Sequence, residues 1–101
     1  MSDSLTPTEG ARYLLERRED RGASATYRAV IYTKDATYEG IATLADDGTA
    51  TVDVADVPED LLAALAMLAK LTARSAPKKR EEGLPPWPAR VLRWRGPGRG
   101  E

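Results

Sequence analysis

The chain has no cysteine, no histidine and no phenylalanine among its 101 residues. Without cysteine it forms no disulfides, no thiolate zinc sites and no cysteine nucleophile, and without histidine it has no imidazole general base. The common routes to catalysis are therefore closed, although aspartate, glutamate, lysine and tyrosine remain. We expect a protein that is not an enzyme and that uses no cofactor or metal.

Long apolar runs and targeting signals are also missing. The N-terminal sequence MSDSLTPTEG has neither the basic nor the apolar region of a secretory signal. The longest apolar run, residues 61–69, is too short to cross a bilayer. The length predicts a single domain, and the default expectation is a soluble cytoplasmic protein with no membrane partner.

What the chain does have is an uneven distribution of charge, which a net charge of −1 conceals. Residues 1–34 carry six basic and five acidic side chains, and residues 35–60 carry eight acidic and no basic ones. Residues 61–101 carry nine basic and three acidic ones. Neighbouring blocks of opposite sign are typical of self-complementation or of a charged tail, unless the charges are merely solvated.

Residues 6–21 predict an N-terminal helix. Thr6 is a good N-cap, Pro7 suits the first helical position and Glu9 completes a capping box. Gly22 would end the helix in the left-handed conformation. The predicted apolar stripe is narrow and consists of Ala11, Leu14 and Leu15. Such a helix would lie on a surface.

Residues 25–54 predict a three-stranded antiparallel meander. The segment 25–33 is rich in β-branched and aromatic residues, and a turn at Lys34 and Asp35 leads into residues 36–44. Pairing Thr33 with Ala36 separates an apolar core face from a mostly polar outer face. The core face would contain Ala25, Tyr27, Ala29, Ile31, Tyr38, Gly40, Ala42 and Leu44.

The turn at residues 46–48 decides how the third strand pairs. A two-residue loop would place the carboxylate of Asp53 on the core face, where burial without a partner costs several kcal/mol. A three-residue loop instead places Ala50, Val52 and Val54 beside Leu44, Ala42 and Gly40. We therefore predict the three-residue loop, which is also a common hairpin connection.

A second helix is predicted to begin near Pro58 and to continue to Arg74. Asp56 is the expected N-cap and Glu59 the expected end of a capping box. The apolar face is predicted to contain Leu61, Leu62, Leu65, Leu68 and Leu71. From Ser75 the sequence becomes rich in proline and charge, which is typical of a linker.

The predicted fold is therefore an α+β domain of order α-β-β-β-α over residues 6–75. A three-stranded antiparallel meander would carry both helices on one face. Residues 76–101 would form an irregular tail, with a possible short strand at 90–95.

This order of elements resembles that of double-stranded RNA-binding domains. Those domains place lysines at the start of the second helix, where this chain has Asp56, Glu59 and Asp60, so the resemblance implies the scaffold and not phosphate binding. The order and the acidic middle block are also similar to those of type III secretion chaperones, which are small acidic dimers. That resemblance implies a chaperone-like or adaptor role.

The outer face of the predicted sheet is the main candidate for function. Covering the core face with both helices would leave an apolar patch on the other face, and monomers seldom expose such a patch at strand centres. The expected partner is another protein or a second copy of this chain, as in a homodimeric adaptor. The candidate residues are Arg28, Val30, Tyr32, Glu39, Ile41, Trp87, Val91 and Trp94. Scattered exposed apolar residues without a partner remain the simpler interpretation.

The basic C-terminal segment supports an alternative function. Cationic side chains would neutralise phosphates, and the two tryptophans could stack on bases, as in proteins that bind single strands. The residues for this nucleic-acid alternative are Lys78, Lys79, Arg80, Arg90, Arg93 and Arg95. A solvated tail, or one that folds onto the acidic block, is the competing interpretation.

Overall fold

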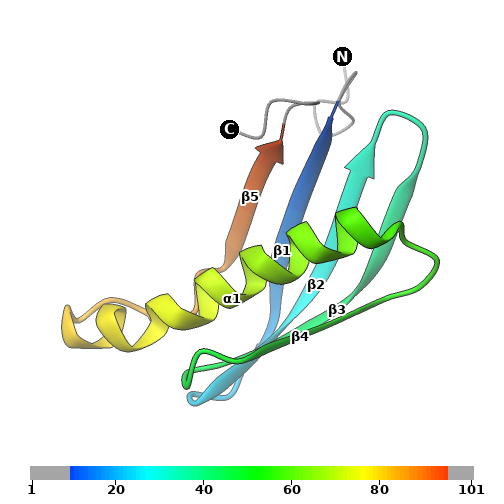
Figure 1. Cartoon of the computed structure of the whole chain (residues 1–101). Helices are drawn as coiled ribbons and strands as arrows, with labels where there is room; N and C mark the ends of the chain where they lie inside the picture. Colours follow the sequence, from blue (N-terminus) through cyan, green and yellow to red (C-terminus); the bar gives the residue numbers. More distant parts are fainter. Residues whose placement is uncertain (1–9, 96–101) are drawn as a thin grey trace.

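The computed structural model describes residues 10–95, which form a five-stranded antiparallel sheet and one long helix (Figure 1). The strands are β1 (Ala11–Asp20), β2 (Ser24–Thr33), β3 (Thr37–Ala45), β4 (Ala50–Val54) and β5 (Arg90–Arg95). The helix α1 (Glu59–Glu81) lies between β4 and β5 in sequence. In space the strands follow the order β4-β3-β2-β1-β5. The last strand therefore pairs with the first.

The predicted N-terminal helix is wrong, because residues 11–20 form strand β1. Ala11, Tyr13 and Leu15 alternate along this strand and are all buried in the core. The predicted helical stripe used Ala11, Leu14 and Leu15 of the same segment, so the local pattern favoured neither structure strongly. Pairing on both sides, with β2 and with β5, decides in favour of the strand. The residues proposed as its cap and capping box, Thr6 to Glu9, lie outside the described part of the chain.

The predicted irregular tail is also wrong. Helix α1 continues through Pro77 to Glu81. Residues 90–95 form β5, in the range where the sequence allows a short strand. Ala76, Trp87 and Val91 belong to the same buried cluster as the central strands. The packed unit therefore extends well beyond Ser75, and the sheet has five strands rather than three. Together these differences remove the α-β-β-β-α order on which both resemblances depended.

The register predicted for β2, β3 and β4 is confirmed. Tyr32 pairs with Thr37, and Gly40, Ala42 and Leu44 pair with Val54, Val52 and Ala50. Gly40 is required at its position, because a Cβ atom there would lie 2.8 Å from Val54 Cα and would overlap the carbonyl oxygen of Asp53. This close approach of β3 and β4 leaves room only for a hydrogen atom.

Helix α1 begins without the predicted cap. Its N-cap residue is Pro58, which makes no side-chain capping bond, and Asp56 has a left-handed φ of 59°. Glu59 and Asp60 lie in the first turn and Lys78, Lys79 and Arg80 in the last, an arrangement that suits the helix dipole. The buried residues of the helix are Leu65, Ala69, Thr72, Ala73 and Ala76.

The core lies between α1 and one face of the sheet. The small residues Ala69, Ala73 and Ala76 allow α1 to pack closely, and the helix crosses the sheet obliquely (Figure 1). Its contacts are mainly with β4 and β3, at one side of the sheet. The far side of the helix, toward β5, is therefore covered less completely. Within residues 10–95, no helix has both the length and the apolar character needed to span a membrane.

Candidate functional site

A groove with apolar walls lies between α1 and the β5 side of the sheet. Met67 and Leu71 are 54% and 52% exposed on the helix, and Trp94 is 56% exposed on β5. With Tyr13 of β1 they line a cavity of about 290 Å³. Large apolar side chains are normally buried, so two that are half exposed beside one cavity mark this surface as unusual. Trp94 contributes to this lining from β5, although its pairing with Arg12 directs its side chain to the outer face of the sheet.

The groove continues along the helix toward its C-terminal end. A second cavity of about 170 Å³ shares Leu68, Leu71 and Arg93 with the first. Its remaining lining residues are Thr72, Ser75, Lys79, Pro88 and Val91. The two cavities together form the α1–β5 groove. The only charged side chains among its lining residues are those of Lys79 and Arg93, so the groove is apolar and mildly cationic.

The helical period explains why these side chains are exposed. Met67 and Leu71 are four residues apart and share one side of α1, beside the buried row that contains Ala69 and Ala73. Leu71 was predicted to belong to the core face, but the close packing of the small residues turns it toward the groove. The sequence contained one usable signal, which is that the apolar residues of α1 span more of its circumference than one sheet can cover.

The outer face of the sheet carries a row of charges. Arg28 of β2 donates to the Glu39 carboxylate on β3 at 2.8 Å and to the Glu16 carboxylate on β1 at 3.1 Å. The hydrogen bond from Arg28 is the main reason that the pKa of Glu39 lies below its ordinary value. The bonds to Glu39 and Glu16 likewise raise the pKa of the Arg28 guanidinium. These neighbours satisfy the side chain of Arg28 within the fold.

The outer-face patch predicted from the sequence is only partly present. Ile41 is 59% exposed and borders a shallow cavity of about 640 Å³ beside Arg28 and Glu39. Val30, however, has no exposed surface, and Tyr32 is half-buried. Val30 is therefore not available to a partner. The structure brings Arg28, Glu39 and Ile41 together but does not form the apolar patch that was expected.

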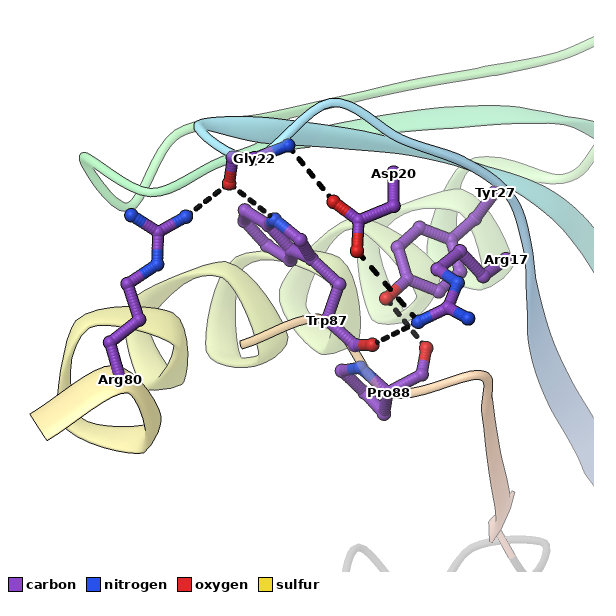
Figure 2. Close-up of polar contacts among 7 residues, drawn as sticks. All are labelled: Arg17, Asp20, Gly22, Tyr27, Arg80, Trp87 and Pro88. Atoms are coloured by element: carbon purple, nitrogen blue, oxygen red, sulfur yellow. Dashed lines mark hydrogen bonds and ion pairs between the residues drawn. The ribbon is translucent and has the colours of Figure 1, made fainter. Parts of the chain in front are cut away.

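Trp87 was predicted to contact a partner, but it is fully buried in the core. Its indole N–H donates to the Gly22 carbonyl at 2.8 Å, and that same carbonyl accepts a bond from Arg80 (Figure 2). Arg17 donates to the Trp87 carbonyl at 2.7 Å, and the Tyr27 hydroxyl donates to the Pro88 carbonyl at 2.8 Å (Figure 2). These contacts attach the segment that follows α1 to strands β1 and β2 and to the turn between them.

The basic residues of the nucleic-acid alternative do not form one cluster. Arg80 forms an ion pair with Asp46 at 3.1 Å, in addition to its bond with Gly22. Lys78 is exposed, and Lys79 is half-buried beside the groove. Arg90 and Arg93 are exposed on β5, and Arg95 pairs through its backbone with Ala11.

The acidic turn has structural roles. Asp47 accepts hydrogen bonds from the Thr49 backbone at 2.9 Å and hydroxyl at 2.6 Å, which lower the pKa of its carboxyl group. Asp46 is engaged by Arg80. Within residues 10–95, no group of three or more acidic side chains is arranged to hold a metal ion.

The candidate site is therefore the α1–β5 groove together with the neighbouring edge of β5. Only Val91 and Trp94 of the predicted partner residues lie on β5 beside it, and Met67 and Leu71 were not predicted. No protein-family model matches this chain, and no match was found among the curated proteins or among the solved structures.

Proposed function

We propose that this chain is a small, non-enzymatic protein-interaction domain that holds a segment of a partner protein in the α1–β5 groove. The observation that carries this proposal is the exposure of Met67 and Leu71 of α1 beside a cavity that Tyr13 and Arg93 also line. Grooves of this kind accept the apolar side chains of a bound helix or strand. Within residues 10–95, β5 is an edge strand, so the groove borders a free sheet edge.

The lining of the groove indicates the chemistry of the segment. Its charged residues, Lys79 and Arg93, are both basic. Arg90 adds a further exposed cation on β5. A segment with apolar residues flanked by aspartate or glutamate would therefore complement the groove, and a basic segment would be repelled.

Selection of peptides from a displayed random library, with the full chain as bait, tests this proposal. Peptides that bind should be apolar and acidic, and Leu71→Lys should weaken their binding at least about tenfold because it places a cation on the apolar wall. Ile41→Lys is the matched control, because Ile41 is equally exposed but lies on the outer face.

Two results would contradict the groove as the binding site. One is the absence of any enriched peptide. The other is a loss of binding in Ile41→Lys without loss in Leu71→Lys, which would assign the function to the outer face with Arg28, Glu39 and Ile41, as the sequence suggested.

The nucleic-acid alternative has weaker support. Trp87 is buried and Arg80 is engaged within the fold, so the stacking and the positive charge available to a strand are smaller than the sequence implied. Titration with a labelled single-stranded oligonucleotide at low salt tests it. Binding that declines steeply as salt rises would favour this alternative over the protein-interaction domain.

A further inference from the structure

We infer that the free edge of β5 pairs with the β5 edge of a second copy of this chain, in antiparallel register centred on Leu92. This inference goes beyond the proposed function, because it assigns a partner to the sheet edge beside the groove. Three features support this pairing: the backbone phase of β5, the positions of its arginines and the exposed apolar residues beside it.

The backbone phase shows which groups of β5 point outward. The Arg17 N–H donates to the Ala89 carbonyl at 2.9 Å, and these two residues continue the β1–β5 register. Hydrogen-bonded and non-hydrogen-bonded pairs alternate along an antiparallel ladder. Residues 91 and 93 therefore bond toward β1, and Arg90, Leu92 and Trp94 direct their N–H and C=O groups to the free edge.

The outward groups limit the possible registers. Within β5, only Arg90, Leu92 and Trp94 can take part in hydrogen-bonded pairs between the two copies. Centring on Leu92 pairs Leu92 with Leu92 and each Arg90 with the partner's Trp94, so every outward group finds a partner. Registers shifted by one pair in either direction leave some of these outward groups unpaired within β5.

The arginines select the same register. Centred on Leu92, Arg90 faces an indole ring and Arg93 faces Val91 of the other copy, so no two arginines are opposite one another. An arginine over a tryptophan face is attractive, and Arg90 already lies opposite Glu16 on β1. A register centred on Arg93 would place like charges directly opposite, which is destabilising.

The paired sheet would have ten strands with both helices on the same face. This follows because directly opposite residues in a ladder share a face, and Leu92 is opposite itself. The two α1–β5 grooves would then adjoin across the two-fold axis. Met67 and Leu71 of each copy would form the two walls of one trough, with Val91 and Arg93 of both copies in its floor.

The absence of cysteine allows a direct test with the full chain. Leu92→Cys should form a disulfide across the two-fold axis under mild oxidation. The Cα separation of a hydrogen-bonded pair, about 5.5 Å, suits a disulfide. Mixing Arg90→Cys with Trp94→Cys chains should give mixed dimers, since these positions are opposite. Ile41→Cys, which is exposed on the outer face, is the control for random cross-linking.

Light scattering on the unmodified chain gives the second readout, with an expected mass twice the monomer's 11.0 kDa. A monomer mass together with Leu92→Cys cross-linking no better than Ile41→Cys overturns the inference. A dimer that cross-links only through Ile41→Cys overturns it as well, because the contact would then be elsewhere. Neither result alters the peptide selection above, so failure here is distinguishable from failure of the proposed function.

Discussion

The indole N–H of Trp87 lies 2.8 Å from the carbonyl oxygen of Gly22, 65 residues earlier in the chain. The bond joins the segment after α1 to the turn between β1 and β2, and it is made by a side chain with no exposed surface (Figure 2). One carbonyl thus receives both Trp87 and Arg80. This contact fixes the path by which the chain returns from the helix to β5.

Replacing Trp87 should therefore weaken the whole fold. Trp87→Ala is expected to lower the free energy of unfolding by about 3–5 kcal/mol through the cavity it leaves. Trp87→Phe keeps most of the ring and should lower it by about 1–2 kcal/mol through the lost hydrogen bond. Urea unfolding measures both effects. Trp94→Phe is the matched control and should change the value by less than about 0.5 kcal/mol.

Removing residues 76–101 should abolish cooperative folding. A chain that ends at Ser75 loses Trp87, Val91 and the whole of β5, and it leaves β1 without its partner on one side. Thermal unfolding followed by circular dichroism should show no sharp transition for this chain. A cooperative transition like that of the full chain would instead support the 6–75 domain predicted from the sequence.

Gly40→Ala should be more damaging than Gly83→Ala, which lies outside the sheet. The added methyl group would overlap the Asp53 carbonyl oxygen and would lie 2.8 Å from Val54 Cα, so β4 must shift. We expect a loss of about 3 kcal/mol in the free energy of unfolding. Gly83→Ala is the control: its φ of 77° costs about 1–2 kcal/mol, but the space around it is open. Equal losses would argue against the close strand approach.

Tyr27 should make stability depend on pH in the alkaline range. Burial raises the pKa of its hydroxyl from 10.0 to about 12, so folding favours the protonated form. Its stabilising contribution is complete below pH 10 and is lost as the pH rises through 12. Urea midpoints between pH 8 and 12 should decline less steeply in Tyr27→Phe than in the natural chain. Tyr38→Phe, which keeps Tyr27, should retain the full decline.

The register of β2, β3 and β4 was predictable because their burial pattern has only one consistent pairing. Placing Asp53 outside the core fixed the loop before β4, and the paired residues are those that the polarity of the faces requires. The position of the carboxylate carried this prediction, since a misplaced charge costs far more than a misplaced methyl group.

Strand β1 was not predictable from its own residues. Its C-terminal half, from Glu16 to Asp20, consists only of charged residues and has helical propensity. Nothing in the local sequence indicates that β5 will pair with it. The prediction for Trp87 was wrong for a similar reason. Its proline-rich surroundings are typical of a linker, whereas its indole packs in the core and donates to the Gly22 carbonyl. Both errors concern contacts between residues about 65–85 positions apart, which a local pattern does not encode.

The candidate site was missed for a related reason. The sequence showed that α1 is apolar over about half its circumference, but its position over the sheet depends on which side the small residues face. The alanines pack against the sheet, which leaves larger side chains exposed at the groove. The packed residues are Ala69, Ala73 and Ala76, and the exposed ones are Met67 and Leu71. The sequence favoured the outer face as the site because Val30 and Ile41 are both apolar, but only Ile41 is exposed.

The pairing of the first strand with the last has a consequence during synthesis. Strand β1 is made early, yet its partner β5 is nearly the last segment to be made. Until β5 arrives, the nascent sheet ends at β1, which would present an unpaired edge and a core face lacking Val91 and Trp87. Such long-range closure slows folding. The interval before closure is therefore when this protein is most exposed to pairing with a wrong strand.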